Sequence, residues 1–312
     1  MKRRELVVSA IGLGMAGCLS NATNEDKDPT ATPEATTTPT DDGVRVTSSQ
    51  FEGEPCPRFY KSETACYHEL PPGKPDAPAL IPVDERATDD PPSFLLANKS
   101  SRTYIAYHAN REVMKQTPDG WKRVDPLYVV AEFDSQQQVP PGAVFETKPK
   151  TTTLGRGRYA LYIGGRFEDG GGLALVALFE MATEPFHLEP DDIVTETRDG
   201  DHVYLETEKG RDDNEAVRVT FETGADPDET GLLAAETAFQ TPTLRNALPY
   251  LQQPGISSVE ILTNEHAPFL LDVALYLPHE SPPFHREESP PPNYPTEYRD
   301  ITFTADVPDK TW

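Results

Sequence analysis

The chain has few basic residues for its length. Its 312 residues include 52 Asp and Glu but only 28 Lys and Arg, of which 11 are Lys, and the formal net charge is -24. Nucleic-acid binding depends on cationic side chains that neutralise backbone phosphates. Because this sequence has no basic patch, we exclude nucleic acid as a partner.

The acidic excess has two interpretations. One is a cationic partner, such as a metal ion or a basic polymer. The other is adaptation to concentrated salt, where a Debye length of about 3 Å at 1 M screens the repulsion between carboxylates. Acidic residues are spread over every predicted strand and loop, and Lys is scarce. This distribution favours the salt interpretation.

The sequence also lacks the common local signatures of catalysis. It contains no Gly-x-Ser-x-Gly elbow, phosphate-binding glycine loop, His-Glu-x-x-His motif or paired Cys-x-x-Cys motif. Each of these places a nucleophile, a phosphate or a metal through a fixed spacing. We therefore assign no catalytic residue, metal site or cofactor, and an enzyme is the less favoured class.

One acidic segment resembles part of a calcium loop. Residues 226–231 place oxygen ligands at alternate positions before a glycine, as in the first half of such a loop. The twelfth position is Thr237, where a bidentate Glu is needed, and Pro227 stiffens the start. We favour an acidic loop that leads into a helix.

Two further patterns have competing interpretations. His266, His279 and His285 lie in one C-terminal stretch, but their spacing matches no metal-ligand template, so solvated loop residues are favoured. Arg245 and Asn246 are polar positions within an otherwise apolar helical pattern. They could bind an anionic ligand, and a bond from Arg245 to a neighbouring carboxylate explains them equally well.

The N-terminal apolar run is too short to span a bilayer. It covers residues 6–16, about half of the ~20 residues that a spanning helix needs. A basic start at residues 2–4 and small residues before Cys18 are typical of a removable secretory signal, so residues 1–17 are predicted to be a signal peptide. A chance cysteine after a buried apolar segment is the alternative.

The end of this segment predicts a lipid anchor. Residues 15–18, Met-Ala-Gly-Cys, look like a lipobox, and residues 3–6 resemble a twin-arginine export motif. Cys18 is therefore the predicted lipidation site, and the predicted location is the external face of the cell membrane. Removing Lys2, Arg3, Arg4 and Glu5 takes away two net positive charges and leaves the mature chain at -26.

Only two cysteines remain after Cys18, namely Cys56 and Cys66. In an exported protein such a pair is most simply a disulfide, and closing this loop would stabilise the chain by roughly 3 kcal/mol. His68 lies near enough to suggest a metal site instead, but the sequence nominates no fourth ligand. Residues 51–76 are thus predicted to be a disulfide-stapled connector.

Residues 18–50 are dominated by Thr, Pro, Asp, Glu and Ser. Such a segment buries too little apolar surface to offset its conformational entropy, so a disordered stalk is expected. Asn21 and Asn98 each begin a sequon and are weak candidates for glycosylation.

Residues 77–183 carry short apolar runs at roughly ten-residue spacing, separated by turn signals such as Pro140-Pro141-Gly142. This spacing is typical of an all-β sandwich. Early strands are expected at residues 94–97 and 103–107, and later ones at 159–163 and 173–179.

This region resembles bacterial and archaeal immunoglobulin-like domains of surface proteins. The matching features are a strand that ends in Asn98, a turn before Trp121, the Pro141-Gly142 pair before Val144, and Gly157-Arg158-Tyr159 at the start of a late strand. The resemblance implies a two-sheet sandwich that serves as a spacer or interaction module, with a core around Trp121 and the tyrosines. The overall composition is similar to that of surface lipoproteins of halophilic archaea.

Residues 184–312 have mixed periodicity and are predicted to form a small α+β domain. Strands are expected around a hairpin at Asp199-Gly200, helices at residues 232–239 and 243–251, and an irregular Pro-rich loop at 278–297.

Together these features predict an all-β plus α+β protein that is lipid-anchored at the cell surface and has a non-catalytic binding or structural role. Its expected partners are the membrane, through the N-terminal lipid, and a surface protein or glycan. The alternatives are an envelope hydrolase or an extracytoplasmic ligand-binding protein with its site in the C-terminal domain. A cleft with converging carboxylates or Arg245 would favour these alternatives.

Overall fold

The structure is a computed structural model of the whole chain. It describes residues 48–60, 62–71, 77–118, 120–124, 136–149, 153–212, 216–226, 231–264, 266–276 and 296–306. The predicted signal peptide, Cys18, Asn21, nearly all of the stalk and nearly all of the Pro-rich loop lie outside these residues.

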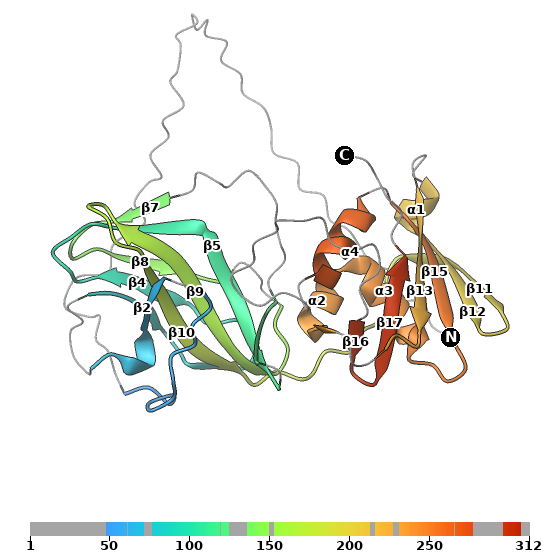
Figure 1. The fold of residues 1–312 in the computed structure, drawn as a ribbon, viewed down its shortest axis with the longest axis horizontal. Coiled ribbons are helices and arrows are strands. Elements are labelled where there is room, and N and C mark those ends of the chain that lie inside the picture. The colour runs from blue at the N-terminus through green and yellow to red at the C-terminus, as the bar shows by residue number, and fades with distance from the viewer. Residues whose placement is uncertain are drawn as a thin grey trace, which may run out of the picture. The chain divides into compact units, whose positions relative to one another are not determined.

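The protein is mostly β, with several sheets and a C-terminal region that contains short helices (Figure 1). The first sheet has the central order β1-β10-β9-β5-β6, with β3 beside β10 and β7 beside β5. β1 and β3 pair with β10 in parallel, whereas the other neighbours are antiparallel. The bounds of its strands are β1 (Glu63–Cys66), β3 (Arg86–Ala87), β5 (Tyr104–Thr117), β6 (Gly120–Arg123), β7 (Gln136–Val139), β9 (Gly157–Phe167) and β10 (Leu173–Met181).

A second sheet contributes to the same core. It contains β2 (Pro78–Pro82), β4 (Phe94–Asn98) and β8 (Val144–Thr147), in that order. Phe94 of this sheet meets Phe179 of β10 edge to face, with ring centroids 5.5 Å apart, and Phe179 stacks on Tyr159 of β9. One apolar cluster therefore includes residues of both sheets.

The opposite face of the first sheet is covered by the segment that precedes β2. We call residues 48–60 and 62–70 the strap; they include β1 and the short 3-10 helix η1 (Tyr67–Glu69). Phe51 and Phe59 of the strap pack on alternate residues of β9 and β10. Because both faces of β10 are covered, its sequence is a continuous apolar run and does not alternate. The sheet residues under the strap are Met114, Ala160, Tyr162, Ala174, Val176 and Leu178.

Trp121 is not in the main core, contrary to the expectation from sequence. It is partly buried at the edge of the strap cluster, where its ring meets Phe59 with centroids 5.8 Å apart. The buried aromatic residues of the main core are instead Phe94, Tyr104, Tyr159 and Phe179, each 0% exposed, together with Tyr67.

The C-terminal region contains a third sheet, with the order β11-β12-β15-β13-β17-β16-β14. Its strands are β11 (Ile193–Asp199), β12 (His202–Thr207), β13 (Val217–Thr223), β14 (Gly231–Leu232), β15 (Ser258–Thr263), β16 (Thr296–Tyr298) and β17 (Ile301–Asp306). Its helices are α1 (Glu208–Asp212), α2 (Ala235–Gln240), α3 (Pro242–Leu251) and α4 (Ala267–Tyr276).

Helices cover one face of this sheet. Figure 1 shows α2, α3 and α4 on the same side of it, and residues of all three share a core with the strands. β12 alternates accordingly, because Val203 and Leu205 are buried whereas His202 and Tyr204 are exposed. Pro249 lies inside α3.

The structure confirms several turns and strands that the sequence predicts. The hairpin at Asp199-Gly200 joins β11 to β12, with Gly200 at a positive φ of 64°. Gly142 has φ 79° in the turn before β8. Strands predicted at residues 94–97, 103–107, 159–163 and 173–179 are all present, and the one at 103–107 extends to Thr117.

Candidate functional site

A buried carboxylate on α2 is the most unusual polar group of the described residues. Glu236 lies in the first turn of α2 and is 0% exposed. Acidic residues are favourable at this end of a helix, but full burial of a charge requires a partner. The surroundings of Glu236 therefore decide what it can do.

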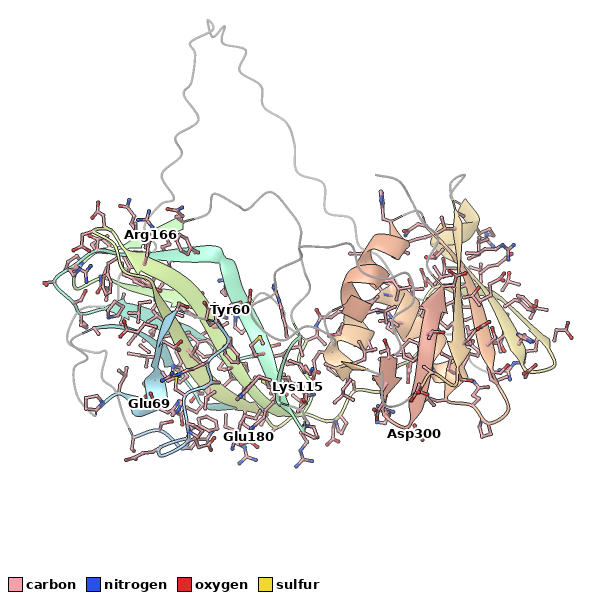
Figure 2. The ribbon with its side chains drawn as sticks, in the orientation of Figure 1. Tyr60, Glu69, Lys115, Arg166, Glu180 and Asp300 are labelled. Atoms are coloured by element: carbon pink, nitrogen blue, oxygen red, sulfur yellow. A yellow bond between two sulfur atoms is a disulfide. The ribbon has the colours of Figure 1, made fainter. Side chains whose placement is uncertain are left out.

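Three donors converge on one oxygen of this carboxylate. Lys115 Nζ lies 2.7 Å from Glu236 Oε1 and forms a salt bridge with it, and the backbone amide of Gly155 lies 3.2 Å from the same oxygen. The hydroxyl of Tyr159 is 2.5 Å from Oε1 and also reaches the carbonyl oxygen of Gly155. Lys115 is near the end of β5 (Figure 2), and Tyr159 is on β9.

The electrostatics of this cluster keep its tyrosines protonated. Burial raises the pKa of Tyr159 far above its usual value, and the negative charge of Glu236 raises it further. Burial also raises the pKa of Tyr298 on β16; Arg299 lowers it and the charge of Glu236 raises it. Tyr159 and Tyr298 therefore act as neutral hydroxyls.

Aromatic rings close the cluster. Phe186 stacks on Phe239 of α2 with ring centroids 4.8 Å apart, and a side chain at Gly155 would collide with the Phe186 ring and approach Glu236. A larger residue at position 155 would therefore force the Phe186 ring to move. The arrangement suits a paired, water-excluded carboxylate.

The sequence signal for Glu236 was weak but present. It is the single charged residue between Leu232 and Phe239, a segment otherwise suited to a buried helix. Its partners come from sites about 80 and 120 residues earlier in the chain, and no local pattern identifies them.

A second polar cluster connects the strap to the first sheet. The hydroxyl of Tyr60, labelled in Figure 2, donates a hydrogen bond to Glu112 of β5, and Arg123 Nη1 lies 3.2 Å from the other oxygen of Glu112. Burial raises the pKa of Tyr60 well above its usual value, and the charge of Glu112 adds to this effect. This cluster anchors the strap.

The predicted disulfide between Cys56 and Cys66 is present. Both half-cystines lie in the strap, with Cys66 at the end of β1. His68 does not join them, because its Nε2 lies 3.1 Å from the backbone oxygen of Glu54. The two sulfur atoms are bonded to each other, so neither is a thiolate that could coordinate a metal ion.

Asn98, a predicted glycosylation candidate, is fully buried. Its Nδ2 donates to the backbone oxygens of Arg102 and Val139, and its Oδ1 accepts from the amide and the hydroxyl of Ser100. A glycan on Nδ2 would replace one of its two hydrogens, so at least one of the two donated bonds would be lost. Glycosylation of Asn98 stays a prediction, at a residue that the fold buries, and Asn21 lies outside the described residues.

Arg245 and Asn246 are paired within the protein. Arg245 Nη2 lies 2.8 Å from Asp191 Oδ2. Asn246, 1% exposed, accepts a bond from the Asp191 amide and donates one to Asp192. The sequence left open an anionic ligand or a bond from Arg245 to a neighbouring carboxylate, and the structure contains the bond to a carboxylate, that of Asp191.

The other candidate patterns remain dispersed or undescribed. Most of the acidic segment 226–231, with His279 and His285, lies outside the described residues, and His266 is exposed. Within the described ranges, no three metal-ligating side chains gather at one place. Of the helices in those ranges, none is both long and apolar enough to cross a membrane.

Comparison with known proteins finds no matching family model and no matching curated protein.

Proposed function

We propose that this chain is a lipid-anchored protein at the external face of the cell membrane, with a binding or structural role and no catalysis of its own. The Cys56–Cys66 disulfide is the observation that carries the proposal, because disulfides persist in oxidising compartments outside the cytosol. It agrees with the export signal and the lipobox-like residues that end at Cys18.

We further propose that residues 77–183 form an immunoglobulin-like sandwich and residues 184–312 a separate α+β domain. The shared core of the first two sheets supports a sandwich, as do the turns before Val144 and Trp121. The helices that cover one face of the third sheet support the α+β assignment.

A surface protein or a glycan is the proposed partner class. The described polar clusters around Glu112, Arg245 and Glu236 bond chiefly to groups within the protein. This internal pairing favours a binding or spacer module over an envelope hydrolase or an extracytoplasmic ligand-binding protein with its site in the C-terminal region.

The anchor is tested by replacing Cys18 with Ser in the full-length chain. We expect the wild-type protein to fractionate with membranes and to carry a lipid mass on Cys18, and Cys18→Ser to be released with no added lipid. Ser20→Ala, a neighbouring change outside the lipobox, is the control and should behave as wild type. A Cys18→Ser protein that stays on membranes, beside a wild type without lipid, would refute the proposal.

A further inference from the structure

The strand β11 forms one edge of the third sheet (Figure 1). Among the described residues it pairs with β12 and with no other strand, and all of its residues except Ile193 are exposed. An edge strand presents a row of backbone N–H and C=O groups that another strand can bind. The opposite edge of the sheet is β14, which has only two residues. β11 is therefore the edge of this sheet that is long enough to accept an added strand.

Two opposite charges lie side by side on β11. Glu196 and Arg198 are two residues apart and so lie on the same face of the strand, with side chains that are 40% and 46% exposed. Arg198 Nε lies 2.8 Å from Glu196 Oε1, and the Tyr250 hydroxyl lies 2.9 Å from Glu196 Oε2. The two Nη atoms of Arg198 have no hydrogen-bond partner among the described residues. The guanidinium thus keeps donors that a further carboxylate can accept.

We propose that β11 pairs antiparallel with β11 of a second copy of this chain, about a two-fold axis at Thr197. This symmetry places Glu196 of each copy opposite Arg198 of the other copy, and Thr197 opposite Thr197. Opposite charges and Thr–Thr pairs at directly opposed positions stabilise a sheet. The proposal goes beyond the binding or structural role proposed above, because it makes a second copy of the chain a partner.

The charges of β11 select this register. An axis at Glu196 would bring two carboxylates together, and an axis at Arg198 would bring two guanidinium groups together, which destabilises a sheet. The register irregularity of β11 lies between Ile193 and Thr195, so it leaves residues 195–199 regular. Charged side chains often protect an edge strand from pairing, but on β11 their alternation matches an antiparallel copy of the same strand.

The net charge of the chain sets the conditions under which the two copies can meet. Each copy carries a formal charge of -24, so two copies repel each other in dilute salt. At 1 M salt the Debye length is about 3 Å, which screens this long-range repulsion and weakens contacting ion pairs less. Self-association is therefore expected in molar salt, and the tests below use 1 M potassium chloride.

The direct test is disulfide cross-linking of the full-length chain carrying Cys18→Ser. Thr197→Cys should give a covalent dimer under mild oxidation, because the two Cβ atoms would lie about 4.5–5.5 Å apart. Thr195→Cys is the matched control on the same strand. Its two copies would lie four residues apart along the pair, about 13 Å, and should stay uncross-linked. No cross-link at position 197, or equal cross-linking at both positions, would overturn the proposal.

An independent test reverses the charges of β11 and measures the dimer dissociation constant by sedimentation equilibrium. Glu196→Arg or Arg198→Glu alone places like charges opposite each other and should weaken the dimer about tenfold or more. The double variant restores opposite charges at both positions and should dimerise as the wild type does. Arg102→Glu, at an exposed pair on the first sheet, changes the net charge as Arg198→Glu does and is the control for net charge.

Circular dichroism shows that each of these variants is folded before its association is compared. A wild type that stays monomeric in 1 M potassium chloride would overturn the proposal. A folded double variant that dimerises no better than the single variants, or a loss as large in Arg102→Glu as in Arg198→Glu, would also overturn it.

Discussion

Lys115 supplies the positive charge that Glu236 needs in order to remain buried. Its side chain is only 18% exposed, and Glu236 is not exposed at all. The remaining donors to Glu236 are the neutral Tyr159 hydroxyl and the Gly155 amide. Loss of Lys115 would leave a buried carboxylate without a compensating charge, which costs more than loss of an exposed pair.

We therefore expect Lys115→Met to lower the free energy of unfolding by about 3–5 kcal/mol, because it removes the charge and keeps most of the side-chain volume. Arg102→Met is the control, since the Arg102–Asp169 pair is exposed and such pairs contribute about 0–1 kcal/mol. Urea denaturation monitored by circular dichroism measures both. Equal losses in the two variants would contradict the assigned role of Lys115.

Asn98 shows how one buried amide can connect three segments. Its bonds join the end of β4 to the loop at Arg102 and to the end of β7 at Val139. The Ser100 of its sequon is itself bonded to Asn98 Oδ1. Residues that form a modification motif in the sequence here form a turn, which the motif alone could not reveal.

At the scale of elements, the strap depends on side-chain bonds along its whole length. Gln50 bonds Glu85 through its backbone amide at 2.7 Å, and Glu54 pairs with Arg158 at 2.6 Å. Tyr60 bonds Glu112. The disulfide closes the loop that carries Phe59 and Tyr60, so it keeps both rings against the sheet.

We expect the double substitution Cys56→Ala with Cys66→Ala to lower the free energy of unfolding by about 3 kcal/mol, the loop-closure value for a loop of this size. The fluorescence of Trp121 should shift towards longer wavelength, because Phe59 would move away from the indole ring of Trp121 more readily and expose that ring to water. Wild-type protein treated with a reductant should reproduce both changes, and Cys18→Ser should reproduce neither. Unchanged stability after reduction would show that the disulfide does not hold the strap.

The C-terminal helices differ from the sequence prediction mainly at their boundaries. α2 begins at Ala235 and not at Leu232, because Gly231–Leu232 form β14 and pair with β16. β16 lies more than sixty residues later in the chain. A long-range strand pairing therefore overrides a local helical pattern, and propensity alone does not include that competition.

At the scale of the whole molecule, the dominant feature is the formal net charge, which is -24 for the chain and would be -26 for the predicted mature form without residues 1–17. Several cations are already paired at the surface, including Arg198 with Glu196 and Arg218 with Glu260. Carboxylates still outnumber cationic side chains, 52 to 28. At 0.01 M salt the Debye length is about 30 Å, so these carboxylates repel one another across much of the molecule. This repulsion opposes the compact state.

Molar salt should therefore stabilise the folded chain. We expect the melting temperature of Cys18→Ser protein without its signal peptide to rise by roughly 4–8 °C from dilute to 2 M potassium chloride, if screening contributes about 2 kcal/mol. Thermal unfolding in calcium chloride of matched ionic strength is the control. A melting temperature that rises with millimolar calcium but not with potassium chloride would indicate a divalent-cation partner. A melting temperature that changes with neither salt would contradict the acidic-surface interpretation.

Local chemistry in the sequence was sufficient for the turns, for most strands and for the disulfide. Gly142 and Gly200 adopt backbone conformations that other residues rarely accept, and the two cysteines that follow Cys18 have one simple pairing. Those inferences need only neighbouring residues. The tertiary structure alone decided that the strap covers β9 and β10, that Trp121 lies outside the core, and that Asn98 and Glu236 are buried. Each of these features depends on contacts between residues that are far apart in the chain. The free energies of such contacts cannot be inferred from a short segment of sequence.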